Sequence, residues 1–119
     1  MAEKRHPYYY SLSLYNRWKS MRQRCINPSC QAYPHYGARG ITICEDWGSY
    51  PNFRDWAIQA GFDESLSLDR IDPDGNYCPE NCRWTTAYIQ AHNRHGTHAY
   101  RLARALGVDV TEILQEVPR

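Results

Sequence analysis

A cluster of turn-forming residues in the second half of the chain constrains the fold most strongly. Pro73-Asp74-Gly75-Asn76 separates residues 66–72, where apolar and polar side chains alternate, from a shorter extended segment at 83–85. Alternation is typical of a half-buried strand, and a Pro-Asp-Gly-Asn run is typical of a turn. A segment with a helical pattern then runs from Thr86 to about Arg94. The sequence therefore predicts a strand, a loop, a second strand and a helix.

The N-terminal half has the apolar spacing of two helices. An apolar stripe at intervals of three and four residues predicts a helix from Ser11 to about Cys25. Asn27-Pro28 ends it, because proline disfavours helical geometry in the residue before it. A second stripe predicts a helix over about 50–60, and Gly61 is placed to end it.

Between these helices the sequence predicts a loop and a short strand. Residues 26–40 form the loop, which closes with Tyr36-Gly37-Ala38-Arg39-Gly40. Its glycines allow a simple turn, or a close approach in which Arg39 binds a phosphate. Ile41-Thr42-Ile43-Cys44 is predicted to be a strand, with its two isoleucines on one side.

The last segment, residues 96–119, predicts a pair of short helices. One spans about Ala99 to Ala105, Gly107-Val108 makes a tight turn, and the other continues through Val117. Such a pair is similar to a helix-turn-helix, and a plain helical hairpin that caps the core is an equal alternative. We thus expect an α+β fold in one small domain, with a flexible tail at 1–10, a main body at 11–95 and this pair.

Charge is segregated along a chain whose net charge is only +1. Residues 1–30 carry six basic side chains and one acidic one, a balance of +5, whereas residues 61–80 carry six acidic side chains and one basic one, a balance of −5. This suits a protein that holds phosphates with one part and a divalent cation with another, or one with two solvated faces of opposite sign. No apolar run is long enough to span a membrane, and the N-terminus lacks the apolar stretch of a secretory signal, so we expect a cytoplasmic protein.

A carboxylate and two carboxamides are expected to meet near the predicted strands. Asp69 lies late in the first strand, and Gln90 and Asn93 lie on one face of the helix that follows the second strand. Oxygen ligands of this kind suit Mg²⁺ better than zinc. Asn81, in the loop between the strands, has the donors and acceptors to fasten that loop.

At these residues the sequence resembles the HNH (ββα-metal) endonuclease family, in its small phage and mobile-element branch. The resemblance covers roughly residues 14–94. It rests on these strings: Leu68-Asp69-Arg70-Ile71-Asp72, Asp74-Gly75-Asn76-Tyr77, Pro79-Glu80-Asn81-Cys82-Arg83-Trp84, Gln90 and Asn93, and upstream Leu14-Tyr15-Asn16, Arg24-Cys25, Asn27-Pro28, Tyr36-Gly37-Ala38-Arg39-Gly40-Ile41 and Cys44.

The resemblance implies a ββα finger at 66–94 that cuts DNA by hydrolysing phosphodiester bonds with one Mg²⁺ or Mn²⁺ ion. The first metal ligand of the family falls on Asp69 and its loop-bracing asparagine on Asn81. Its last ligand falls on Gln90, with Asn93 as a nearby substitute. We therefore expect an endonuclease that nicks or cuts duplex DNA. The alternative is a catalytically inactive module on the same scaffold that binds DNA or a host protein, in the host cytoplasm if it is phage-encoded.

The chain departs from the family where the general-base histidine should stand, because that position holds Arg70. A guanidinium cannot accept a proton near neutral pH, although it could neutralise the scissile phosphate. Another group, such as His92, His35, His95 or His98, would then take the proton. The residues expected to contact DNA are Arg17, Lys19, Arg22, Arg24, Arg39, Arg83 and Arg94.

The five cysteines suggest a second site. Four of their thiolates, or three with one histidine, could hold a structural zinc ion. Cys25, Cys44 and Cys82 are the favoured three, because they lie in the segments that resemble the family. The alternative is that they are small buried hydrophobic side chains.

Overall fold

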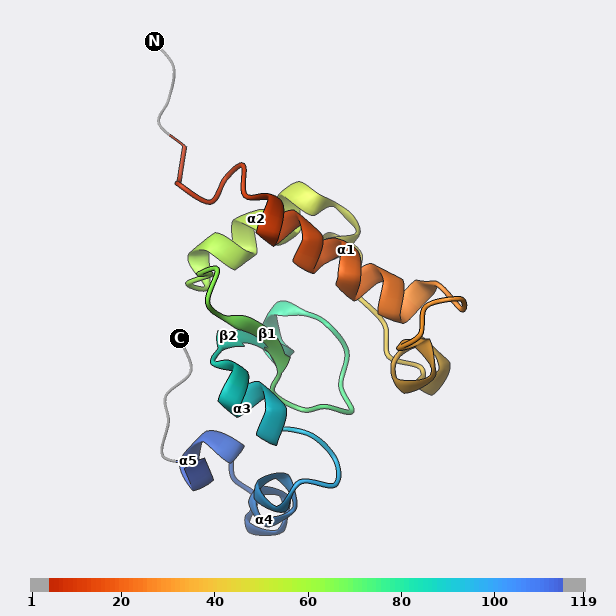
Figure 1. The fold of residues 1–119 in the computed structure, drawn as a ribbon, viewed down its shortest axis with the longest axis vertical. Coiled ribbons are helices and arrows are strands. Elements are labelled where there is room, and N and C mark those ends of the chain that lie inside the picture. Colours follow the sequence, from red (N-terminus) through yellow and green to blue (C-terminus); the bar gives the residue numbers. More distant parts are fainter. Residues whose placement is uncertain (1–4, 115–119) are drawn as a thin grey trace. The chain divides into compact units, whose positions relative to one another are not determined.

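The computed structural model describes residues 5–114, and Figure 1 shows its ribbon. The described chain combines helices with a two-stranded antiparallel sheet, which confirms the predicted α+β class. Its internal contacts divide into two compact units, one that ends at Gly61 and one that begins at Phe62. Within the described residues, no helix is both long and apolar enough to cross a membrane.

The first unit is built around two helices, α1 (Leu12–Ile26) and α2 (Tyr50–Gln59), which contact each other. Ser11 begins α1, because its side chain accepts a hydrogen bond from the backbone of Leu14. Both helices confirm the sequence prediction. Their buried side chains form the core with a tryptophan from the connecting segment: Leu14, Met21, Trp47, Phe53 and Ala57.

Three short 3₁₀ helices connect α1 to α2: η1 (Tyr33–His35), η2 (Gly37–Arg39) and η3 (Glu45–Gly48). The predicted strand at 41–44 is wrong, because only Ile43 makes a β bridge and η3 begins directly after Cys44. Apolar alternation here reflects burial of Ile41 rather than pairing with a neighbouring strand.

The predicted N-terminal tail is partly described. Residues 1–4 lie outside the described residues, whereas Tyr8 and Tyr9 are half-buried. The guanidinium of Arg54, on α2, lies 3.8 Å from the centre of the Tyr9 ring, and that of Arg5 lies 4.7 Å from it. Tyr9 therefore attaches this segment to α2.

The second unit contains the sheet. β1 (Ser67–Arg70) pairs with β2 (Cys82–Thr85) in antiparallel register, with Asp69 opposite Arg83. η4 (Pro79–Asn81) precedes β2, and α3 (Ala87–His92) follows it. The predicted order of strand, loop, strand and helix is thus confirmed.

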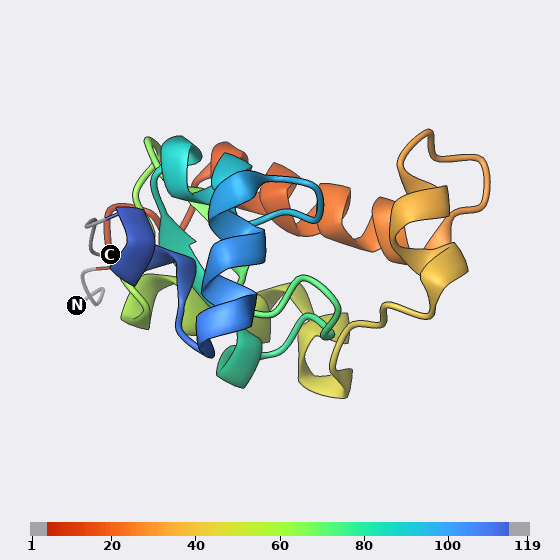
Figure 2. The same ribbon diagram turned by 90° about the horizontal axis from the view of Figure 1, so that it is seen from below.

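Two further helices complete the second unit, α4 (His98–Leu106) and α5 (Val110–Leu114). Gly107 ends α4 in the left-handed conformation (φ 71°), which favours glycine. α3 contacts β1, α4 and α5, as Figure 1 and Figure 2 show. The predicted boundary after residue 95 falls inside this unit, because α3, α4 and α5 share one apolar cluster. Its buried members are Ile89, Ala99, Ala103 and Val110. The predicted end of the last helix, at Val117, lies outside the described residues.

Candidate functional site

The antiparallel register places a carboxylate and a guanidinium on the same face of the sheet. Asp69 and Arg83 are directly opposite each other, and the Nε of Arg83 donates a hydrogen bond of 2.9 Å to Oδ2 of Asp69. Asp69 is only 4% exposed. A buried carboxylate needs a charged or hydrogen-bonding partner, and Arg83 provides both.

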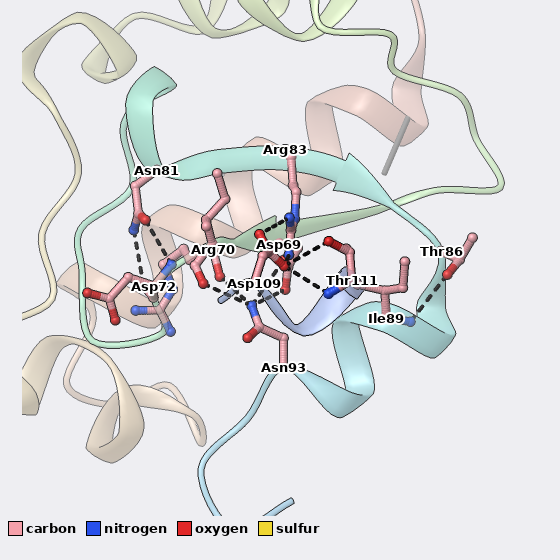
Figure 3. A network of polar contacts seen from close by, with 11 residues as sticks. Asp69, Arg70, Asp72, Asn81, Arg83, Thr86, Ile89, Asn93, Asp109 and Thr111 are labelled. Atoms are coloured by element: carbon pink, nitrogen blue, oxygen red, sulfur yellow. Dashed lines mark hydrogen bonds and ion pairs between the residues drawn. The ribbon is translucent and has the colours of Figure 1, made fainter. Parts of the chain in front are cut away.

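The same guanidinium also binds a second carboxylate. Its Nη1 donates to Oδ2 of Asp109 at 2.6 Å, and its Nη2 donates to Oδ1 of Asp109 at 3.1 Å. Asp109 directly precedes α5, and its Oδ1 also accepts hydrogen bonds from the backbone nitrogen and the hydroxyl of Thr111. Arg83 therefore joins the sheet to the start of α5, as Figure 3 shows.

Asn93 reaches the same carboxylate from the end of α3. Its Nδ2 lies 3.2 Å and 3.4 Å from the two oxygens of Asp69, 2.8 Å from the backbone oxygen of Arg70 and 3.2 Å from that of Ile71 (Figure 3). All four neighbours are hydrogen-bond acceptors, so the amide nitrogen rather than the amide oxygen must face them. The structure thus brings Asp69 and Asn93 together, but with Asn93 as a donor.

Burial and charge act in opposite directions on the two carboxylates. Burial raises the pKa of Asp69 to about 6, against the lowering effect of Arg83 and Asn93. Burial alone would also raise the pKa of Asp109, but hydrogen bonds from Arg83 and Thr111 outweigh it and hold that pKa below its usual value. The pKa of Arg83 is raised, because its two carboxylate partners outweigh its burial. At neutral pH the network therefore has two negative charges and one positive charge.

The structure places the other predicted ligand, Gln90, in a different interaction. Its side-chain oxygen accepts a hydrogen bond of 3.3 Å from Nη2 of Arg94, at an exposed position. Gln90 and Arg94 therefore pair with each other at the C-terminal end of α3.

Arg70, where the resemblance to the endonucleases would place a general base, binds the loop that follows β1. Its Nη1 donates to the backbone oxygens of Pro73 (2.6 Å) and Gly75 (2.9 Å), and its guanidinium lies over the ring of Tyr77. Arg70 therefore fastens this loop.

Two of the histidines considered as replacements for the general base have partners of their own. His92 has its Nδ1 2.7 Å from the backbone oxygen of Tyr88. His95 has its Nε2 2.6 Å from a carboxylate oxygen of Asp74. Neither contact is with Asp69.

Asn81 fastens the same loop from its other end. Its Oδ1 accepts a hydrogen bond from the backbone nitrogen of Asp72, and its Nδ2 donates to the backbone oxygens of Asp72 and Asn76. A Cβ atom added at Gly75 would lie 2.6 Å from that Nδ2, so the loop also requires the small residue. Bracing of this loop is the role that the sequence predicts for Asn81.

The basic residues expected to contact DNA lie in several places. Four belong to α1, and three of these cations lie over aromatic rings: Lys19 over Tyr15, Arg22 over Trp18 and Arg24 over Tyr36. Arg17 is half-buried on the same helix, and Arg39 is exposed. Arg83 differs from the rest, because its side chain is 11% exposed and bound to two carboxylates. It is therefore engaged inside the unit with Asp69 and Asp109, and its assignment to the DNA contacts stays a prediction.

The cysteines do not form a recognisable metal site in the described part of the chain. None of the five cysteines, all of which lie within the described residues, forms a disulfide bond. Over residues 5–114, no group of three or more His, Cys, Asp or Glu side chains is placed to hold a metal ion. Burial raises the pKa of Cys82 to about 12, which disfavours the thiolate that zinc would require. Zinc binding remains a prediction.

The donor set around Asp69 does not fit a divalent cation. A magnesium or calcium ion binds carboxylate oxygens at roughly 2.0–2.6 Å, and next to Asp69 such an ion would meet the positive charge of Arg83. Asn93 presents a nitrogen to this point instead of an oxygen. As it stands, this arrangement offers no position for a metal ion beside Asp69.

Asp109 is the residue that sequence reasoning missed. It lies directly before the last predicted helix, and aspartate is a favoured residue at a helix start, so a capping role could have been predicted. Its partner could not, because Arg83 is 26 residues away in sequence. Asp109 and Asn93 also line a hollow of about 280 Å³, together with Asp72 and Arg104.

Comparison of the chain with family models, with curated proteins and with solved structures found no match. The similarity to HNH endonucleases remains a resemblance carried by spaced residues of the sequence, and the functions that it implies are proposals.

Proposed function

We propose that this chain is a module that binds duplex DNA without cutting it. The observation that carries the proposal is the ion pair between Asp69 and Arg83. A nuclease of the HNH type needs the carboxylate at this position to hold a metal ion, whereas here the carboxylate holds a guanidinium. Where such a nuclease has its general-base histidine, this chain has Arg70, whose guanidinium fastens a loop.

The basic side of α1 supports DNA as the ligand. Arg17, Lys19, Arg22 and Arg24 recur along this helix. Aromatic rings beneath three of these cations limit the conformations of their long side chains. Lysine and arginine side chains held in this way suit contacts with the phosphates of a duplex, which fix position without reading the base sequence.

A second candidate function, metal-dependent cleavage, is favoured by one observation. Asp69 and Asn93 converge from β1 and from the end of α3, as the resemblance to the endonucleases implies for the metal site. Cleavage would require Arg83 to leave Asp69 and Asn93 to turn its amide oxygen toward the metal. The two candidate functions therefore make different predictions for Asp69: cleavage of DNA would require this carboxylate, whereas binding of DNA alone would not.

A paired assay separates them. Wild type and Asp69→Asn are incubated with supercoiled plasmid in Mg²⁺ and then in Mn²⁺, and binding to a labelled duplex is measured by fluorescence anisotropy over a range of salt. We expect both proteins to bind equally well, more weakly as salt rises, and to leave the plasmid supercoiled. Nicking by wild type that Asp69→Asn abolishes would overturn the proposal in favour of the nuclease. Binding that is absent at low salt would exclude DNA as the ligand.

A further inference from the structure

We propose that Arg83 is the resident cation of this site, so that its guanidinium occupies the place where a divalent metal ion would otherwise bind. This role of Arg83 is independent of DNA binding, because it concerns only how Asp69, Asn93 and Asp109 are held together.

The convergence of groups on Arg83 resembles the coordination of a metal ion more than an ordinary surface pair. Two carboxylates meet at this one cation, which donates a hydrogen bond to Asp69 through Nε and to Asp109 through both Nη atoms. The three groups come from three different elements: β1, β2 and the residue before α5. A planar guanidinium can bind two carboxylates in one plane, which a lysine ammonium cannot do with the same geometry.

Burial makes this cation necessary. The side chains of Asp69 and Arg83 are only 4% and 11% exposed, so little water reaches either partner. All three guanidinium nitrogens have a carboxylate acceptor, and Asn93 provides a hydrogen-bond donor to the other side of Asp69. The negative charge of Asp69 is thus satisfied without any ion from solution.

If Arg83 acts as the cation, its removal should create a metal site. Arg83→Ala would leave the carboxylates of Asp69 and Asp109 facing a shared space, and Asp109 lines the adjoining hollow, which provides a path from solvent. Two carboxylates and water molecules are a suitable ligand set for Mn²⁺. The wild-type protein should not bind Mn²⁺ there, because the guanidinium repels it.

The test is a titration of the full chain with Mn²⁺ alone, in which bound and free Mn²⁺ are measured by electron paramagnetic resonance. We expect Arg83→Ala to bind one Mn²⁺ ion about tenfold or more tightly than wild type, a difference of about 1.4 kcal/mol or more. The double variant Arg83→Ala, Asp69→Asn should lose this binding. Arg101→Ala, which removes an exposed arginine of α4, is the matched control and should behave as wild type does.

Two results would overturn the inference. One is a wild-type protein that binds one Mn²⁺ ion and loses it on Asp69→Asn. The other is a folded Arg83→Ala variant that binds Mn²⁺ no better than wild type. If Arg83→Ala does not fold without metal, its circular dichroism spectrum is recorded with Mn²⁺ and with KCl. Recovery of the folded spectrum with Mn²⁺ but not with KCl would support the proposal, and no recovery would refute it.

Discussion

Arg83 and Asp109 lie 26 residues apart in sequence and form a two-pronged ion pair, with N–O distances of 2.6 Å and 3.1 Å. Because Arg83 also pairs with Asp69 across the sheet, this contact joins β1, β2 and the start of α5 into one network. The stability of the second unit should therefore depend strongly on this arginine.

Replacement of Arg83 by alanine should lower the free energy of unfolding by about 3–5 kcal/mol at pH 7, because it leaves the buried carboxylate of Asp69 without a counter-charge. Much of this loss should be recovered in the double variant Arg83→Ala, Asp69→Asn, which removes the unpaired charge. The free energy of unfolding of both variants is measured by urea denaturation in metal-free buffer, followed by circular dichroism. Equal losses in the single and the double variant would show that packing, rather than charge, accounts for the effect.

The stability of wild type relative to Asp69→Asn should fall as pH rises from about 4 through about 6. The pKa of Asp69 is raised to about 6 in the folded protein from its ordinary value of 3.8, so folding favours the protonated form. Protonated Asp69 therefore adds to the stability of the folded state at a pH below its pKa in the unfolded chain. This added stability is lost as pH rises through the pKa of the folded protein, and it amounts to at most about 3 kcal/mol. The charged or titratable groups facing Asp69 are Arg83, Asp109 and Cys82.

The measurement is a series of urea denaturations of both proteins between pH 4 and pH 7.5. Asp109 titrates below its usual range and is present in both proteins, so its effect largely cancels in the difference. The raised pKa of Asp69 would be contradicted if the difference in free energy of unfolding between the two proteins stayed constant across this range. It would also be contradicted if that difference grew in favour of wild type as pH rises.

Replacement of Asn93 by alanine should destabilise the protein by about 1–3 kcal/mol, because the backbone oxygens of Arg70 and Ile71 lose a hydrogen-bond donor. Asn93→Asp should cost more, because it places a second carboxylate against Asp69. Gln90→Ala is the matched control on an exposed pair and should change stability by less than about 0.5 kcal/mol.

Thermal unfolding of the Asn93 variants, measured once with EDTA and once with Mg²⁺, distinguishes a hydrogen-bond donor from a metal ligand at this position. A donor role predicts the same loss in both buffers. A loss for Asn93→Ala that appears only in Mg²⁺ would identify Asn93 as a ligand instead.

The loop between the strands should be sensitive to a small change at Gly75. A Cβ atom there would lie 2.6 Å from the amide nitrogen of Asn81, which already holds the backbone of Asp72 and Asn76. Gly75→Ala should therefore cost about 1–3 kcal/mol. Hydrogen exchange of the backbone amide of Asp72 should speed up in the same variant. Gly48→Ala, where a Cβ would meet no atom within 4 Å, is the control.

The elements of the fold were largely predictable, because each depends on local patterns. The turn-forming residues after β1, the proline after α1 and the glycine after α4 mark boundaries that the structure reproduces. The exception, the predicted strand at 41–44, shows the limit of this reasoning. Alternating isoleucines indicate a buried side, but a strand also needs a partner strand, and within residues 5–114 the segment 41–44 pairs only through one β bridge.

The site was predictable only in part. The convergence of Asp69 and Asn93 followed from the order of strand and helix, and Asn81 was placed correctly in the loop. The identity of the cation was not predictable, because it depends on strand register and on a contact with Asp109 that is distant in sequence. From the sequence, a metal ion from solution is expected beside Asp69. In the structure the cation beside Asp69 is Arg83, which the sequence places among the DNA contacts.

If α1 is the DNA-binding surface, removing its charges should weaken binding to every duplex to a similar extent. Lys19→Ala should reduce the slope of log affinity against log salt by about 1 for each phosphate that is no longer neutralised, and so should Arg17→Ala. Neither change should alter discrimination between unrelated duplexes, because phosphate contacts do not read base sequence. Arg101→Ala again provides the control, since it removes one positive charge elsewhere. Fluorescence anisotropy at several salt concentrations measures the slope, and an unchanged slope in both α1 variants would move the DNA contacts to another surface.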